Sequence, residues 1–215
     1  VEIELYKKGV KLAYLPSTSA LRMRFNAVDS KLNQAIIEDA INTIEARLPR
    51  YLYARNEVSL SEVVGALLLT QEKSLATVES CTGGGIANEI TKIAGCSKYF
   101  KGSIVSYANE VKISNVNVSE VALEKYGAVS REVVEQMAIN GKARLNVDYC
   151  ISTSGVAGPD GGSSEKPVGF VWIAIATPEG VFSLNKTFGN SRERIIKSAV
   201  LTSLNLLRCE LMNIL

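Results

Sequence analysis

The sequence predicts an α/β protein: a three-layer α/β/α sandwich with a mixed sheet, preceded by a small α+β unit. After residue 57, short runs of β-branched and apolar residues alternate with segments whose apolar residues recur at helical spacing, which is typical of a sheet covered by helices. Residues 1–56 instead show two strand patterns and one long helical pattern, and they are too few for a large core. We therefore divide the chain into segments 1–56 and 57–215.

The first segment has two strand patterns followed by a helical pattern. Lys11–Leu15 is a short strand pattern, and Leu21–Val28 alternates apolar and polar residues as a half-buried strand does. Between Leu32 and Leu48 the apolar residues follow helical spacing, and Pro49 ends the pattern. The residues Tyr51–Ala54 favour one more strand.

The second segment opens with the sequence Ser59-Leu-Ser-Glu62, a capping box that marks the start of a helix. The elements expected after it are, in order, a strand at Ser74–Val78, a helix to about Ile93, a strand at Ser103–Ser106, a short helix at Glu120–Lys125, a longer helix capped by Ser130, a strand at Tyr149–Thr153, a hairpin of Val168–Ala176 and Val181–Thr187, and a last helix with an apolar stripe from Ile195 to Leu211. Strands and helices therefore alternate along most of this segment.

The composition of the chain excludes several functions. Charged residues make up 21% and hydrophobic residues 47%, which is ordinary for a globular protein and argues against disorder. Lys and Arg number 24 against 22 Asp and Glu, and this net charge of +2 is too balanced for a nucleic-acid or acidic-membrane partner. The chain has no His, which excludes Ser-His-Asp triads and His-ligated metals. Acid–base chemistry must then use Lys, Tyr, Asp, Glu or Cys.

The cysteines and the apolar runs indicate a cytoplasmic protein. None of the 4 cysteines forms a C-x-x-C pair or belongs to a disulfide framework, so we expect reduced thiols and no metal. No apolar run reaches about 18 residues, so we expect no spanning helix. The N-terminal residues VEIELYKKGV lack the basic and apolar regions of a signal peptide.

We predict a homodimer or larger assembly. The first segment is too small to bury its own apolar face, and the last helical region carries Leu201, Leu206 and Ile214 off its main stripe. Light scattering at micromolar concentration should therefore give a multiple of the chain's mass, and a monomeric mass would contradict the prediction.

The first candidate site is Glu79-Ser80-Cys81-Thr82-Gly83-Gly84, where a strand passes into a helix. Glycines let a ligand approach the backbone, and the N–H groups at a helix start can stabilise an anion. Ser80 could be a nucleophile with those N–H groups as part of an oxyanion hole. Alternatively, Ser80 or Thr82 only caps the helix. Cys81 is a second possible nucleophile, but it would need a base other than His.

The second candidate is Ser106-Tyr-Ala-Asn-Glu-Val-Lys112. A Lys that is desolvated beside apolar groups can lose its proton near neutral pH and then act as the base for a serine. Tyr107 would relay a proton or hold the amine of Lys112. Alternatively, Lys112 is an ordinary solvated residue of a helix.

Two further stretches could bind anionic groups. The segment from Ser154 to Gly169 is rich in glycine and could present backbone N–H groups to a phosphate, although it is neither a Walker A loop nor a dinucleotide fingerprint. Alternatively, it is a plain long turn. In Gly189-Asn190-Ser191-Arg192, the guanidinium of Arg192 could bind a phosphate or carboxylate through two parallel hydrogen bonds. Alternatively, Arg192 is a surface residue of a first helical turn.

Together these stretches resemble one family. ESCTGG, SYANEVK, SGVAGPDGGSSEKPVG and GNSRE are similar, in order and spacing, to the C-terminal domain of the competence/damage-inducible CinA family, which is the nicotinamide-nucleotide amidase (PncC-type) family. This resemblance covers about residues 57–215. The stretch KLAYLPSTSALRMRFNA resembles the KH-like segment that precedes this domain in full-length CinA proteins. The resemblance implies that an N-terminal molybdopterin-binding-like domain of the same polypeptide is missing here.

The resemblance implies a cofactor-independent hydrolysis of the carboxamide of nicotinamide mononucleotide (NMN), which gives nicotinate mononucleotide and ammonia. It implies that Ser80 is the nucleophile and Lys112 its base, with Tyr107 assisting. The substrate-binding residues it implies are Thr82, Gly83, Gly84, Asn109, Ser154, Gly155, Gly158 and Arg192.

The chain departs from the family pattern before the last helix, because the family often reads G-D-R where this chain has Asn190-Ser191-Arg192. We therefore expect Arg192 to be held less rigidly. The third Gly of ESCTGGG and Phe170 are tolerable variants. The alternative function is a non-catalytic nucleotide-binding or regulatory module. Nucleic-acid binding is disfavoured, since a KH module needs a G-x-x-G loop and residues 1–56 contain only Gly9.

Overall fold

The computed structural model describes residues 2–17, 20–27, 29–189 and 191–215. The chain divides into two compact units, Val1–Glu57 and Val58–Asn213, and each is described by itself. Among these residues, no helix has both the length and the apolar character needed to cross a membrane.

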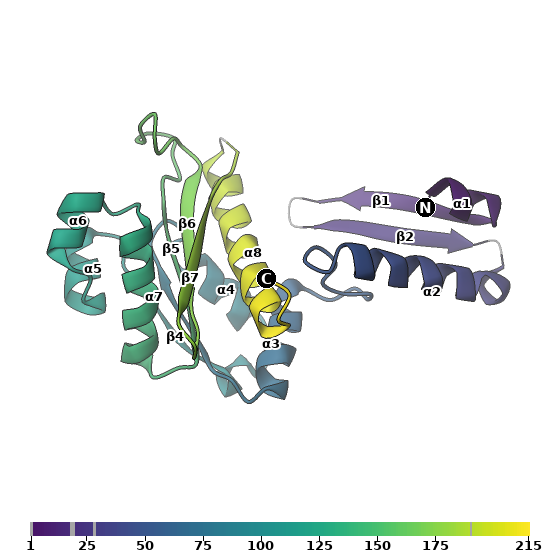
Figure 1. The fold of residues 1–215 in the computed structure, drawn as a ribbon, viewed down its shortest axis with the longest axis horizontal. Coiled ribbons are helices and arrows are strands. Elements are labelled where there is room, and N and C mark those ends of the chain that lie inside the picture. Colours follow the sequence, from purple (N-terminus) through teal and green to yellow (C-terminus); the bar gives the residue numbers. More distant parts are fainter. Residues whose placement is uncertain (1, 18–19, 28, 190) are drawn as a thin grey trace. The chain divides into compact units, whose positions relative to one another are not determined.

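The first unit is a hairpin packed on one long helix (Figure 1). Its elements are α1 (Glu2–Lys7), β1 (Val10–Pro16), β2 (Leu21–Ala27) and α2 (Ser30–Arg47). The strands are antiparallel, and a small core unites α1, β1 and α2 through Leu5, Val10 and Ala40. The two predicted strands and the predicted helix are thus confirmed, while the pairing of the strands as a hairpin and the helix α1 were not predicted. Val28, the last residue of the predicted second strand, lies outside the described residues.

The strand predicted at Tyr51–Ala54 is wrong. The backbone N–H groups of Tyr51 and Leu52 both donate to the carbonyl of Leu48, at 3.0 and 3.1 Å, and so continue the end of α2 as a turn. A strand needs a partner for its backbone, and in the described part of this unit the sheet contains β1 and β2 alone. Aromatic β-propensity is therefore overridden by the local turn.

The second unit contains a five-stranded mixed sheet in the order β4-β3-β5-β6-β7. Strands β3, β4 and β5 are parallel, whereas β6 and β7 are antiparallel additions. The elements are α3 (Leu60–Thr70), β3 (Leu75–Glu79), α4 (Gly85–Thr91), η1 (Cys96–Lys98), β4 (Phe100–Val105), α5 (Asn109–Val116), α6 (Glu120–Tyr126), α7 (Arg131–Leu145), β5 (Tyr149–Gly155), β6 (Phe170–Ala176), β7 (Val181–Thr187) and α8 (Arg192–Leu211).

Helices cover both faces of this sheet (Figure 1). Helix α7 packs on β3, β5 and β6, and it carries α5 and α6 on its outer side. On the opposite face, α8 contacts β5 and β6, α4 contacts β3, and α3 packs against α8. The predicted three-layer α/β/α sandwich with a mixed sheet is confirmed.

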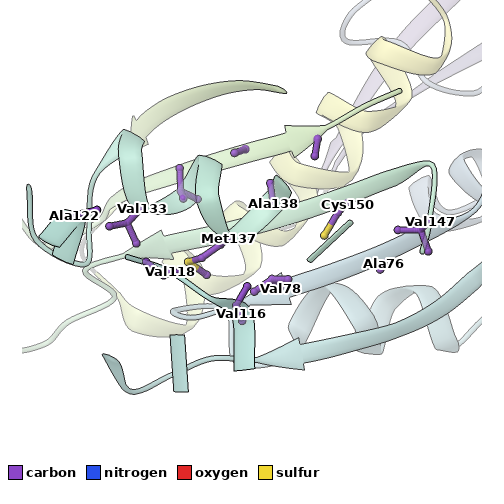
Figure 2. Close-up of a cluster of buried hydrophobic side chains, with 13 residues drawn as sticks. Ala76, Val78, Val116, Val118, Ala122, Val133, Met137, Ala138, Val147 and Cys150 are labelled. Carbon is purple, nitrogen blue, oxygen red and sulfur yellow. The ribbon is translucent and has the colours of Figure 1, made fainter. Parts of the chain in front are cut away.

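The core beneath α7 fixes that helix tightly against the sheet (Figure 2). Val78 of β3, Met137 of α7 and Cys150 of β5 are fully buried in one cluster. A Cβ atom on Gly141 of α7 would lie 2.3 Å from Val78, so only glycine allows this close approach. The hydroxyl of Ser130 caps the same helix by accepting from the N–H of Val133, as predicted.

The parallel strands end at one edge of the sheet. Ser80 follows β3, Ser106 follows β4, and Ser154 lies near the end of β5. Ligands of open α/β sheets bind outside the carboxyl ends of the strands. We therefore expect a ligand-binding site at this edge.

Candidate active site

A cavity of about 210 Å³ lies at this edge of the sheet. It is lined by residues from the ends of β3, β4 and β5, from α5, from the segment between α6 and α7, and from the start of α8. These residues are Ser80, Cys81, Tyr107, Asn109, Lys112, Ala128, Val129, Ser154, Gly155, Ala157 and Arg192. The structure thus brings together residues from all four candidate stretches.

Ser80 occupies a tight turn between β3 and α4. Its carbonyl accepts from the N–H of Gly83 at 3.0 Å, and its own N–H donates to the carbonyl of Thr153 at 3.0 Å. Gly83 and Gly84 have φ angles of 59° and 92°, a left-handed conformation that favours glycine. The N-cap of α4 is Gly84, with no side-chain cap, so the interpretation of Ser80 or Thr82 as a simple helix cap is wrong.

The first N–H groups of α4 are already occupied. The carboxylate of Glu79 accepts from the N–H groups of Ile86 and Ala87, at 3.0 and 2.9 Å. Those two groups therefore cannot serve the oxyanion hole that we expected at this helix start. Sequence reasoning missed the role of Glu79, and the signal was a carboxylate at the end of a buried strand.

Lys112 lines the cavity and is almost completely buried, with 1% of its surface exposed. Its Nζ donates to the backbone carbonyls of Ser106 and Tyr107, at 2.9 and 3.0 Å. Burial lowers the pKa of the Lys112 amine, while the nearby Cys81 and Glu110 oppose this shift. The interpretation of Lys112 as a solvated helix residue is therefore wrong.

Cys81 lies beside Ser80 but is poorly suited to attack a substrate. Burial raises the pKa of its thiol to about 12, and the carboxylate of Glu79 adds to this shift. Because the thiolate is the reactive form, very little of Cys81 is nucleophilic at neutral pH.

Arg192 links two sides of the cavity. Its Nη1 donates to the carbonyl of Gly158 at 2.7 Å, and its Nη2 donates to the hydroxyl of Tyr107 at 3.0 Å. Arg192 is thus exposed yet fixed by two hydrogen bonds, although the G-D-R pattern is absent. Asn190, which stands at the departure from that pattern, lies outside the described residues. Tyr107 holds the amine of Lys112 through its backbone carbonyl, while its hydroxyl faces Arg192.

The remaining predicted residues divide into two groups. Asn109, Ser154 and Gly155 line the cavity, and the hydroxyl of Ser154 donates to the carbonyl of Ala128 at 2.7 Å. This bond places Ala128 and Val129, which sequence reasoning missed, against the site. The residues that lie outside the cavity lining are Thr82, Gly83, Gly84 and Gly158.

The described ranges contain no group of three or more Cys, Asp and Glu residues that could hold a metal ion. The expectation that the site works without a metal stays a prediction.

The fold and the cavity define a three-layer α/β sandwich protein that holds a serine and a buried lysine in one cavity at the carboxyl edge of its parallel strands. Residues 57–211 match the family model of the CinA C-terminal domain, and the chain belongs to this family. The KH-like resemblance of residues 1–56 stays a prediction.

Curated relatives and solved structures agree with this family. The chain is 41% identical over 202 residues to a CinA-like protein of Cytophaga hutchinsonii, covering 93% of this chain and 48% of that protein. A CinA-like protein of Flavobacterium psychrophilum is 40% identical over 208 residues, covering 95% and 50%. The chain therefore spans about half the length of the curated relatives it matches.

The similar solved structures correspond to the larger unit. The competence/damage inducible protein CihA from Agrobacterium tumefaciens is 34% identical with a TM-score of 0.65, covering 72% of this chain and 97% of that one. A CinA superfamily protein from Klebsiella pneumoniae is 28% identical with a TM-score of 0.70, covering 72% and 96%.

Proposed function

We propose that this site hydrolyses the carboxamide of NMN to nicotinate mononucleotide and ammonia by a serine–lysine mechanism. The observation that carries the proposal is the Lys112 amine, which is buried in a cavity lined by Ser80 and held by two backbone carbonyls. Membership of the CinA family supports it.

The contacts of Lys112 favour a role as base. A neutral amine has two N–H groups and one lone pair, and the carbonyls of Ser106 and Tyr107 accept both N–H groups. The lone pair is then left to take the proton of the Ser80 hydroxyl. Burial favours this neutral form, since it penalises the charged one.

The reaction then follows the usual order of covalent amide hydrolysis. Ser80 Oγ attacks the carboxamide carbon as its proton passes to Lys112, and the Lys112 ammonium returns that proton to the departing ammonia. Water hydrolyses the resulting acyl-serine, with Lys112 again as the base, and frees the carboxylate product.

The size and charge of the cavity suit one end of a nucleotide. A volume of about 210 Å³ is below the range of roughly 300–1,000 Å³ for sites that hold drug-sized ligands. We infer that the nicotinamide ring enters and that the ribose phosphate stays toward the exposed Arg192. Two N–H groups of Arg192 are engaged by Gly158 and Tyr107, so others of its five remain for a phosphate.

Incubation of the chain with NMN tests the proposal. We expect release of one ammonia per nicotinate mononucleotide formed, and slower turnover of nicotinamide riboside, which lacks the phosphate. Saturable binding of NMN without ammonia release would contradict the amidase and support a non-catalytic nucleotide-binding module.

A further inference from the structure

A buried carboxylate that the mechanism above does not use lies directly beside Ser80. Glu79 is the last residue of β3, and its relative exposure is 0%. Its oxygens accept from the backbone N–H groups of Ile86 and Ala87, at 3.0 and 2.9 Å. The hydroxyl of Thr82 also donates to it, at 2.7 Å. All three partners are hydrogen-bond donors, which matches a carboxylate group that accepts through both oxygens.

The direction of these bonds determines which neighbouring hydroxyl donates and which accepts. Thr82 has one hydroxyl proton, and it donates that proton to Glu79. In the 2.7 Å contact between the hydroxyls of Thr82 and Thr153, Thr153 must therefore be the donor. Thr153 also accepts the N–H of Ser80 through its carbonyl. One chain of hydrogen bonds thus joins Glu79 to the backbone of Ser80.

Glu79 also closes the turn that carries Ser80. It precedes that turn in sequence and binds N–H groups that follow it, at the start of α4. The N-cap residue Gly84 has no side chain with which to hold the helix start. Within the described part of the chain Glu79 forms no ion pair, so neutral donors alone hold its carboxyl group in place.

We propose that Glu79 is a positioning residue, which holds Ser80 at the geometry required for attack with Lys112 as base. The proposal rests on the function proposed above. Glu79 acts through the turn and not on substrate, because it does not line the cavity. Its loss should therefore reduce kcat and leave KM nearly unchanged.

Asp148 offers a matched control, because it lies at the opposite end of β3 and β5 from Ser80. Its carboxylate accepts from the N–H and the hydroxyl of Ser74, at 2.8 and 2.7 Å, and from Lys73 Nζ at 3.3 Å. These bonds tie the start of β3 to the start of β5, away from the cavity lining. The control Asp148→Asn thus changes a carboxylate that also accepts several hydrogen bonds, but it does so at the end of β3 and β5 that lies away from the cavity lining.

The test compares Glu79→Gln with Asp148→Asn by steady-state kinetics on NMN and by thermal unfolding. The amide NH₂ of Gln cannot accept from a backbone N–H, so one of the two helix-start bonds is lost. We expect Glu79→Gln to lower kcat by about 10- to 100-fold, with KM within about twofold of wild type, since small misplacements of reacting groups are this costly. Asp148→Asn should lower Tm but leave kcat within about twofold. An unchanged kcat in Glu79→Gln overturns the proposal. It is also overturned if kcat falls in proportion to the drop in Tm in both variants.

Thr82 gives a milder second pair of variants, should Glu79→Gln not fold. Thr82→Val removes the hydroxyl donor to Glu79, whereas Thr82→Ser keeps it. We expect a severalfold lower kcat in Thr82→Val and recovery in Thr82→Ser. Equal kcat values in these two variants overturn the proposal.

A fluorophosphonate probe separates this proposal from the amidase function. If the wild-type chain releases no ammonia from NMN, the proposed function fails, and the rate at which the probe modifies Ser80 becomes the readout. Modification that is about 10-fold slower in Glu79→Gln, but not in Asp148→Asn, supports positioning. A Ser80 that does not react in wild type, or that reacts equally in both variants, overturns it.

Discussion

Replacing Lys112 by Met should lower kcat on NMN by about 10²- to 10⁴-fold, the range for loss of a general base. Met keeps an unbranched apolar stem in the buried site and removes the amine that the carbonyls of Ser106 and Tyr107 hold. Lys112→Arg should fail too, because a guanidinium does not release its proton. Ammonia release under saturating NMN measures both effects.

Lys166 is the matched control for Lys112. Its Nζ also donates to a backbone carbonyl, that of Tyr126, at 2.9 Å, but it lies outside the cavity lining. Lys166→Met should therefore keep kcat within about twofold. An active Lys112→Arg enzyme would show that the amine is not the base and would direct attention to Tyr107, which also lines the cavity.

The lowered pKa of Lys112 also predicts two pH dependences. kcat/KM should rise with pH through an apparent pKa below the ordinary lysine value of 10.5, because the neutral amine is the active form. At pH values between the lowered pKa and 10.5, Lys112 is deprotonated in the folded chain and protonated in the unfolded chain. The unfolded chain binds more protons there, so the free energy of unfolding should rise with pH across that range, and Lys112→Met should remove this contribution.

Replacing Ser80 by Ala should reduce ammonia release by about 10⁴-fold or more, the scale seen when a nucleophile is removed. The fold should be nearly unaffected. Ser80 contributes its backbone to the turn, and its N–H and carbonyl bonds remain in Ala. Since Gly84 is the N-cap of α4, no side-chain cap is lost.

Cys81→Ala is the control in the same turn. Its thiol has a pKa of about 12 and is almost entirely protonated at neutral pH, so this variant should keep its turnover. Near-wild-type turnover in Ser80→Ala, together with loss in Cys81→Ala, would assign the nucleophile to the thiol. Circular dichroism and thermal unfolding of both variants would confirm that each is folded.

The fold was largely predictable from the sequence because its elements carry local signals. The apolar strand patterns, the capping box at Ser59 and the cap at Ser130 each depend on residues a few positions apart. The failure is at Tyr51–Ala54, where β-propensity meets no strand partner and the N–H groups of Tyr51 and Leu52 instead continue the turn that ends α2.

The candidate site was predictable in part, for a similar reason. Ser80 and Lys112 stand in short motifs that can be recognised along the chain. Glu79 could not be assigned a role, since its partners at Ile86 and Ala87 become neighbours only once the turn has formed. The burial that distinguishes Lys112 from a surface lysine comes from packing, which spacing alone does not reveal.

The cavity draws Ser80, Lys112 and Ser154 from the ends of three parallel strands or the helices that follow them. These residues meet only after β3 has paired with β4 on one side and β5 on the other. Parallel strands need long crossover connections, and such non-local pairing forms late compared with local helices. A partly folded chain would therefore hold these three residues apart, and the cavity would be incomplete. Under the proposed function, ammonia release would report the fraction of molecules whose central sheet is complete.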